Sequence, residues 1–335
     1  MKLGITGGVS PGGRWSEAVE IITEADRLGY DSVWLGETWG YEIFTSMADV
    51  AHRTDQIKIG AGIANVFTRS AAVIAMAAAT LDEQSGGRIV LGLGSSGAIV
   101  IERLHGVPFE NPLTRIREYI EIINSLIAGE RLHHSGEIFE LQQGFRLRMN
   151  PIRDHIPIYV ASITPKSLNQ SGEIADGVIP IFWPGDRYRE LREQLDRAST
   201  SAGRSAGSVA IAPYITTALV ESESERETVR FEARRPVAFY IGRMGRFYAE
   251  HLERCGFTEE VAAVRRGWED GHDAAAAGVS DALLDATALV GSADEIAGKL
   301  ERWTEAGLDQ PVLNISGDNE KKLRTLRALA PLNET

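Results

Sequence analysis

The chain has very little cysteine: Cys255 is the only one among 335 residues. A single cysteine excludes an internal disulfide framework and a cysteine-rich metal site. Basic residues are also in deficit, with 35 Lys and Arg against 47 Asp and Glu, for a formal net charge of −12. Proteins that bind nucleic acid or anionic membranes through general charge attraction carry surplus Lys and Arg. We therefore expect neither partner, and any anionic ligand must be held by local donors.

Long hydrophobic runs are missing as well. The most apolar segment, Ala71 to Leu81, is much shorter than the roughly 20 residues that span a bilayer. Residues 1–13 lack the apolar stretch of a signal peptide, so we expect a cytoplasmic protein. The histidines show no metal-ligand spacing such as HExxH, and His133 and His134 are expected at the surface. No nucleophile elbow or P-loop is present, so we predict no metal site and no covalent hydrolytic chemistry.

The chain is instead rich in one repeated pattern, a short apolar run followed by a longer helical segment. Trp15 to Leu28 is one example, with apolar residues on one helical face and Gly29 as a C-terminal stop. The pattern recurs about eight times, which is typical of parallel strands joined by crossover helices. Such a chain either closes into an eight-stranded barrel or stays open as a doubly wound sheet.

Two stretches interrupt this pattern. Residues 130–156 contain turn signals and short alternating runs, which suggest a hairpin-like insertion. Residues 221–290 are charged and then alanine-rich, which suggests a helical insertion before the last barrel units. We therefore expect one domain over residues 1–335 with two insertions.

An acidic residue, Glu37, comes directly after a predicted buried strand, between Trp34 and Trp39. Barrel enzymes place catalytic groups at this end of their strands, and a partly buried carboxylate there suits acid/base work. The alternative is that Glu37 caps the next helix. Arg69, which follows the next strand, is expected to pair with a surface acid, although it could bind an anionic ligand.

Small residues follow two further strands. Gly92 to Gly97 matches GxGxxG, but the dinucleotide-binding form needs a helix, a strand and an acid that do not follow here. We expect a turn that lets the backbone approach a flat or anionic ligand. After a later strand, Pro165 suits the first position of a helix whose free N–H groups could bind phosphate, although an ordinary capped helix fits equally well.

Together these segments resemble the bacterial luciferase-like superfamily of flavin and deazaflavin oxidoreductases. The string AAATLDEQSGGRIVLGLGSSG, residues 77–97, is similar to the central signature of that superfamily. The segments LHGVPF (104–109), PLTR (112–115) and REY (117–119) resemble the branch that uses coenzyme F420. The similarity extends over about residues 1–185 and more thinly beyond.

The resemblance implies a (β/α)8 TIM barrel with insertions, a homodimer, and coenzyme F420 bound at the barrel mouth beside a small-molecule substrate. It implies a cis peptide bond between Gly62 and Ile63. Glu37 would be the catalytic proton donor or acceptor. The substrate wall would be formed by Trp39, Tyr41 and Trp183. The residues implied in cofactor binding are Gly62, Ile63, Ala64, Asn65, Ser95, Ser96, Gly97, Ala161, Ser162, Ile163 and Thr164.

The chain departs from some deazaflavin dehydrogenases in having Thr38 where they have a histidine after the acid. This favours reduction of an activated double bond, imine or carbonyl over sugar-type dehydrogenation. Three alternatives stay open: a monooxygenase that takes reduced FMN from a flavin reductase partner, a non-catalytic cofactor-binding barrel, and a Rossmann dehydrogenase with an open sheet.

Overall fold

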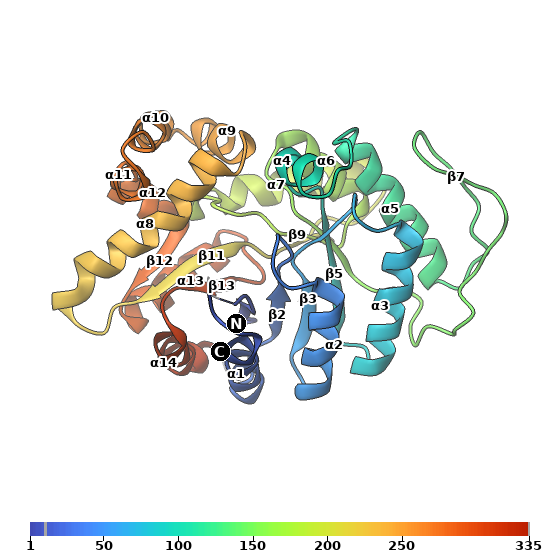
Figure 1. Ribbon diagram of the computed structural model, residues 1–335, viewed down its shortest axis with the longest axis horizontal. Helices are drawn as coiled ribbons and strands as arrows, with labels where there is room; N and C mark the ends of the chain where they lie inside the picture. The colour runs from blue at the N-terminus through green and yellow to red at the C-terminus, as the bar shows by residue number, and fades with distance from the viewer. Residues whose placement is uncertain (10–11, 334–335) are drawn as a thin grey trace.

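The computed structural model describes residues 1–9 and 12–333. Parallel strands alternate with helices along the chain, and successive strands lie side by side (Figure 1). The strands of the barrel are β1 (Gly4–Thr6), β2 (Ser32–Leu35), β3 (Lys58–Ala61), β5 (Ile89–Gly94), β8 (Ile158–Val160), β9 (Gly177–Val178), β10 (Ala210–Ile211) with β11 (Tyr214–Leu219), and β13 (Val312–Ile315). A short strand, β4 (Ala64–Asn65), adds a second pairing along β5.

The ring of strands closes through the segment that contains β10 and β11. On one edge of this segment, the Ala212 N–H donates to the Val178 carbonyl at 2.9 Å. On its other edge, the Val312 N–H donates to the Pro213 carbonyl at 3.0 Å, and β13 in turn pairs with β1. Within residues 1–9 and 12–333, eight strand positions therefore form one closed parallel ring. The predicted barrel is confirmed, and the open sheet is wrong.

Helices cover the outside of this ring. In α1 (Trp15–Arg27), Ala18, Ile22 and Ala25 form a buried face, and the chain leaves the helix at Gly29 with φ of +77°. The other covering helices are α2 (Ile43–Arg53), α3 (Ala71–Ser85), α5 (Pro112–Ile127), α6 (Pro165–Ile174), α7 (Tyr188–Ser201), α13 (Ala293–Glu305) and α14 (Asn319–Leu329). In the described chain, none of the helices combines the length and apolar character needed to cross a bilayer.

The interior of the ring is filled by large side chains from facing strands. Trp34 is buried and its ring centroid lies 5.4 Å from that of Tyr159 and 6.4 Å from that of Tyr214. Val90, Ile179, Ala212 and Val312 complete this cluster. The barrel is therefore a packed core beneath its mouth, as is usual for the fold.

Residues 221–290 contain a group of helices: α8 (Arg226–Arg243), α9 (Phe247–Arg254), α10 (Thr258–Gly267), α11 (His272–Ala277) and α12 (Asp281–Thr287). Buried residues such as Val237, Val261 and Leu283 give this group a hydrophobic core of its own. Two elements were not expected from the sequence. The strand β12 (Ala288–Gly291) pairs with the outer part of β11, and the short helix α4 (Ala98–Arg103) follows the turn after β5.

Residues 130–156 contain an antiparallel pair, β6 (His134–Ser135) and β7 (Glu140–Leu141), which extends away from the barrel in Figure 1. Glu118, a buried carboxylate on α5, holds this hairpin. It accepts hydrogen bonds from the backbone N–H groups of residues 137–139 at 2.7–3.0 Å and lies 3.2 Å from His134 Nε2. His134 is therefore not a surface residue, because its side chain is only 10% exposed. The hairpin docks on α5 through the buried carboxylate of Glu118 and through the Phe139 ring, whose centre lies 5.6 Å from that of Tyr119.

The Glu118 contact makes hairpin docking dependent on pH. Burial by itself raises the pKa of Glu118, but the hydrogen bonds from Ile138, Phe139 and His134 outweigh it and hold the pKa below its ordinary value. A depressed folded-state pKa stabilises the docked hairpin above the ordinary value of 4.5, and this stabilisation is lost as the pH falls through the folded-state pKa.

We predict that Glu118→Gln reduces the hydrogen-exchange protection of residues 134–141 at pH 7 by about fivefold, because a charged acceptor is replaced by a neutral one at a cost of about 1 kcal/mol. Protection of the wild-type hairpin, corrected for intrinsic exchange, is expected to fall below pH 4.5. The matched control is Glu137→Gln, an exposed acid on the hairpin itself. Equal protection in the wild type and Glu118→Gln would contradict the docking role.

Candidate active site at the barrel mouth

The strand ends at the mouth of the barrel carry small residues whose backbone is accessible. Gly36 follows β2, Gly62 follows β3, Ser95 follows β5 and Ala161 follows β8, and all four are half-exposed or exposed. The residues just before them, such as Leu35 and Val160, are buried. Four neighbouring strands therefore end in a surface with little side-chain bulk.

Glycines allow this surface to lie close to the aromatic core. A Cβ on Gly62 would lie 1.6 Å from Tyr214 Oη, and one on Gly60 would lie 2.4 Å from the ring of Trp34. Tyr214 Oη also lies 3.5 Å from the Gly62 carbonyl, within reach to donate to it. The Gly62–Ile63 peptide bond is cis, as the resemblance implied. Ile63 is half-exposed, whereas Ala64 is buried.

Glu37 is held by the arginine that follows the next strand. The guanidinium of Arg69 donates from Nη1 to Glu37 Oε2 at 2.8 Å and from Nη2 to Glu37 Oε1 at 2.6 Å. Arg69 Nη2 also donates to Glu42 Oε1 at 2.5 Å. The hydrogen bond to Glu37 is the main reason that the pKa of Arg69 is raised. Glu37 and Arg69 therefore form one paired unit at the mouth.

This geometry extends one expectation and corrects another. Arg69 does pair with a surface acid, Glu42, whose side chain is 42% exposed, but it also pairs with Glu37, whose side chain is only 13% exposed. Glu37, however, is not the cap of the following helix. That cap is Glu42, whose side chain accepts from the Thr45 N–H at 2.7 Å, while the Ile43 N–H reaches Glu37 only at 3.4 Å.

The turn after β5 brings Ser95, Ser96 and Gly97 to the mouth, where all three are half-exposed. Ser96 adopts the left-handed region with φ of +57°. Asn65, by contrast, is buried, and its side-chain oxygen accepts from the N–H groups of Phe67 and Thr68 at 3.0 Å. Asn65 therefore shapes the loop that carries Arg69.

The start of α6 is capped by its own residues. Thr164 Oγ1 accepts from the Ser167 N–H at 3.2 Å, and Ser167 Oγ accepts from the Thr164 N–H at 3.1 Å. Ser162 is buried and its hydroxyl lies 2.8 Å from that of Ser171, so its side chain is committed to α6. Ile163 and Thr164 are half-exposed in front of the helix.

The three aromatic residues predicted for the substrate wall are not brought together. Trp39 is 61% exposed and Tyr41 is 45% exposed, and the Tyr41 ring lies 5.4 Å from that of Trp15 on α1. Trp183 stacks instead on His251 of α9 at 4.8 Å. In the part of the chain that the structure describes, no ring contact joins Trp183 to Trp39 or Tyr41.

Two arginines beside α6 were not identified from the sequence. Arg254, at the end of α9, donates to the Ile163 carbonyl at 3.2 Å, and Arg187 donates to the Arg254 carbonyl at 3.3 Å. Ile163 and Arg254 lie 91 residues apart in the sequence, so their contact becomes visible only once the helical insertion is placed against the barrel. Positive charge therefore lies next to the N-terminus of α6, where helix geometry favours anions.

Two other titratable groups of this region are uncharged at neutral pH. Burial lowers the pKa of His251 to about 4. Burial also raises the pKa of Cys255, whose sulfur lies 3.9 Å from His251 Nδ1. Within residues 1–9 and 12–333, no group of three or more His, Cys, Asp or Glu side chains is arranged to hold a metal ion.

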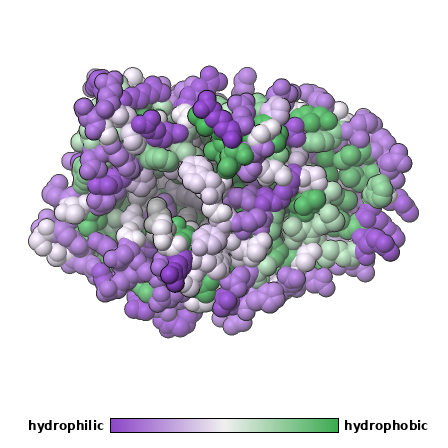
Figure 2. Space-filling view, in the orientation of Figure 1, coloured by the Kyte–Doolittle hydropathy of each residue, from purple (hydrophilic) through white to green (hydrophobic). Residues whose placement is uncertain are grey.

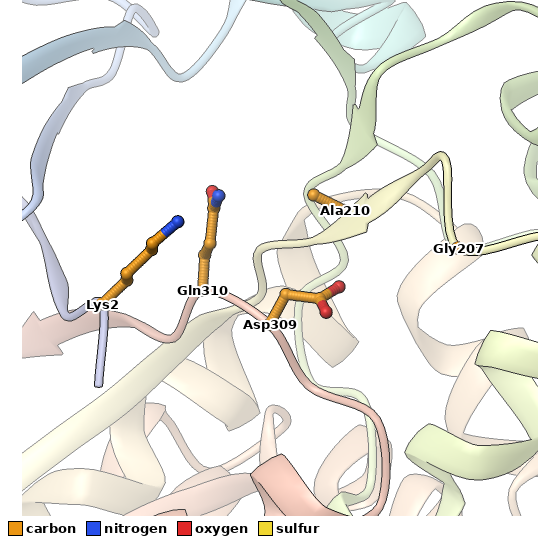
Figure 3. Close-up of a pocket in the computed structure, with 5 residues that line it drawn as sticks. All are labelled: Lys2, Gly207, Ala210, Asp309 and Gln310. Atoms are coloured by element: carbon orange, nitrogen blue, oxygen red, sulfur yellow. The ribbon is translucent and has the colours of Figure 1, made fainter. Parts of the chain in front are cut away.

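A separate recess lies at the opposite end of the barrel, beside the strand N-termini. It is lined by Lys2, Gly207, Ala210, Asp309 and Gln310, and Figure 3 shows Lys2 and Gln310 extending in the same direction. Asp309 accepts from the Ile211 N–H at 2.7 Å, and Gln310 accepts from Tyr159 Oη at 3.0 Å. These polar groups complete the floor of the barrel. The recess is therefore at the other end from the C-terminal strand ends, where barrel enzymes bind and convert their substrates.

Comparison with known proteins identifies the family. The profile of luciferase-like monooxygenases matches residues 3–310. The chain belongs to this luciferase-like family. The resemblance found in the sequence is thereby confirmed.

Relatives of the luciferase-like chain include a candidate coenzyme F420-dependent oxidoreductase of Mycobacterium tuberculosis, strain H37Rv. It is 32% identical over 98% of this chain and 99% of its own length. The 5,10-methylenetetrahydromethanopterin reductase of Archaeoglobus fulgidus is 30% identical over 97% of each chain. Both similarities therefore cover barrel and insertions alike.

Solved structures show the same fold. The coenzyme F420-dependent tetrahydromethanopterin reductase of Methanopyrus kandleri superimposes with a TM-score of 0.85 at 23% identity. The superposition covers 99% of each chain. The monooxygenase RslO1 of Streptomyces bottropensis has a TM-score of 0.75 at 21% identity, covering 99% of this chain and 98% of its own. At these identities the likeness concerns the barrel architecture.

The close packing under the mouth predicts an effect on stability. A Cβ on Gly92 would lie 2.0 Å from the Ala61 carbonyl oxygen, which belongs to the backbone of β3. We expect Gly92→Ala to lower the free energy of unfolding by about 1–3 kcal/mol, because an overpacked strand must shift. Urea denaturation measures this change.

The control is Gly298→Ala in α13, where the nearest side-chain atom to a new Cβ would be 3.6 Å away. This substitution is expected to raise the free energy of unfolding by up to about 1 kcal/mol, since alanine is the better helix former. Equal effects of the two substitutions would refute the packing argument.

Proposed function

We propose that the chain is a coenzyme F420-dependent oxidoreductase that transfers a hydride between the deazaflavin and a small organic substrate at the barrel mouth. The observation that supports the proposal most is the pair of relatives named for this cofactor or for methylenetetrahydromethanopterin reduction, which match nearly the whole chain. The mouth offers a second argument, because its strand ends carry little side-chain bulk and Arg254 lies beside it.

The residues at the mouth fit a flat ring with an anionic tail. Gly36, Gly62, Ser95 and Ala161 present backbone with little side-chain bulk, against which a planar ring can lie. Gly62, Ile63, Ser96 and Gly97 are the proposed ring contacts. When bound, the deazaflavin supplies the hydride-carrying carbon, while the protein orients it and excludes water.

The anionic tail is assigned to the start of α6. The first N–H groups of a helix lack acceptors within the helix, and the dipole there favours negative charge. Ile163 would present its backbone N–H to a phosphate, and Thr164 would only flank it, because the Thr164 N–H already donates to Ser167 Oγ. Ala161 would line the approach. Arg254 adds a cation that already contacts Ile163. The hydroxyl of Ser162 takes no part, because it is bonded to Ser171.

Glu37 is proposed to handle the proton that accompanies hydride transfer. Its carboxylate lies beyond the end of β2, and both oxygens accept hydrogen bonds from Arg69. Trp39 and Tyr41, on the loop after Glu37, and Trp183 remain the proposed substrate contacts, from two sides of the mouth. Reduction of an imine, a carbonyl or an activated double bond is the reaction class that we propose.

The cofactor assignment is tested by titrating the protein with F420 and with FMN and following fluorescence. The deazaflavin carries a glutamyl tail that FMN lacks, so F420 is expected to bind more tightly. Arg254→Gln should weaken the binding of either cofactor by about tenfold, since both carry a phosphate and a charge-assisted hydrogen bond to it would be lost.

The matched control is Arg265→Gln, which removes an arginine from the same insertion at an exposed ion pair with Glu253. It should leave both affinities unchanged within about twofold, since exposed pairs contribute little. Tighter binding of FMN would favour a monooxygenase served by a flavin reductase. Binding of neither cofactor would favour a barrel without catalytic function.

A homodimer is part of the proposal. Val73, Met76 and Thr80 are exposed on one face of α3, although this helix is rich in alanine on all sides. Ile152 and Phe145, from the hairpin insertion, are also exposed. Figure 2 shows hydrophobic surface gathered in this region, to the right of the view. A helix that is apolar all round is normally covered, so we assign this face to a second copy of the chain.

We expect Met76→Glu to convert the dimer to monomer in sedimentation velocity, because a charge buried at an apolar contact is strongly unfavourable. Phe247→Glu provides the control, since Phe247 is 36% exposed but lies on α9. A monomeric wild-type protein, or a Met76→Glu variant that remains dimeric, would refute the assigned face.

A further inference from the structure

Arg69 is placed to determine the orientation of the Glu37 carboxylate. Its guanidinium occupies both carboxylate oxygens of Glu37 in a bidentate pair and makes a third hydrogen bond to Glu42. The side chain of Glu42 is more exposed, at 42%, than that of Glu37, at 13%. The pair with Glu37 is therefore the less hydrated of the two, and charge interactions are stronger there.

Arg69 does not depend on Glu37 alone for its position. Tyr119 of α5 donates from its hydroxyl to the Arg69 carbonyl at 2.7 Å. The guanidinium carbon lies 5.3 Å from the centre of the Phe44 ring on α2. Asn65 fixes the preceding turn through the N–H groups of Phe67 and Thr68. Contacts from α2, α5 and the loop itself thus fix the guanidinium beside the mouth.

We propose that Arg69 is a positioning residue that keeps Glu37 as a fixed, oriented carboxylate at the mouth of the barrel. The proposal rests on the proton-handling role given to Glu37 above. The fork of a guanidinium matches a carboxylate with two parallel hydrogen bonds, which fixes the plane of Glu37 as well as its charge. Glu37 is thus ready to accept a proton or to stabilise positive charge that develops on the substrate.

The charges around this pair leave a negative balance. Glu42 from the start of α2 shares Arg69, so two carboxylates face one guanidinium. On α5, Tyr119 contacts the Arg69 backbone, and Arg115 lies 4.8 Å from the centre of the Phe67 ring in the same loop. Among these groups, Arg69 is the cation in direct contact with Glu37.

Carbon-13 NMR of protein labelled at the glutamate carboxyl carbon tests the proposal without cofactor or substrate. The signal absent from Glu37→Gln assigns Glu37. At pH 7 we expect the Glu37 carboxyl carbon to change its chemical shift and to become more mobile in relaxation measurements in Arg69→Gln, because both hydrogen bonds that orient the carboxylate are lost. Arg69→Lys, which keeps the charge but loses the fork, should restore only part of this ordering.

Arg53→Gln is the matched control, since it removes an arginine paired with Asp49 on α2. It should leave the chemical shift and the mobility of the Glu37 signal unchanged. A Glu37 signal with the same shift and mobility in Arg69→Gln, in Arg69→Lys and in the wild type would overturn the proposal. Circular dichroism checks that the variants are folded, and Arg69→Lys keeps the test decisive if Arg69→Gln does not fold.

A kinetic test uses reduced F420 with methylenetetrahydromethanopterin as the hydride acceptor. Arg69→Gln should lower kcat at least about tenfold, as expected for disturbed acid/base catalysis, with F420 affinity unchanged within about twofold. An unchanged kcat in Arg69→Gln would refute the positioning role. A wild-type protein that does not bind F420 would refute the proposed function, while the NMR measurement at pH 7 would still decide the role of Arg69.

Discussion

A closed ring of eight parallel strands can be filled only if large side chains on some strands face very small residues on others. Here Trp34 and Tyr214 occupy the interior, and Gly60 and Gly62 give them room. These two glycines bring the backbone of β3 and of the turn after it close to the aromatic layer, and Gly92 lets β5 lie close to the backbone of β3. The accessible, nearly side-chain-free mouth is therefore a direct result of how the interior is packed.

Positive side chains gather at the mouth of the barrel, although the molecule as a whole is acidic. The chain carries a formal net charge of −12, yet Arg69, Arg187 and Arg254 lie at the mouth end of the barrel. Arg69 is neutralised by carboxylates, whereas Arg254 contacts only a carbonyl among the hydrogen bonds resolved in the described chain. One side of the mouth thus holds an anionic protein group, and the other side can receive an anionic ligand.

Periodicity in the sequence was enough to predict parallel strands joined by crossover helices, because strands covered on both faces and amphipathic helices leave distinct patterns, as in residues 15–28 and 89–93. The choice of a closed barrel over an open sheet came from the family resemblance. Periodicity missed β12 and α4, which are too short for a clear pattern. It also missed the partner of Arg69, since Glu37 is 32 residues away and only the adjacency of β2 and β3 brings them together. His134 was misplaced for the same reason, because its partner Glu118 is on α5.

The helical group α8–α12 buries Val237, Val261 and Leu283 in a hydrophobic cluster that is separate from the main core and also includes Phe182 and, from β11, Ala218. A segment with a separate apolar centre tolerates changes on its outer surface without repacking the strands beneath it. Arg254, at the end of α9, nevertheless extends from this segment to the barrel. Residues on the helical group α8–α12 can therefore change during evolution, and with them the groups that face the start of α6. The parallel ring that carries Glu37 need not change.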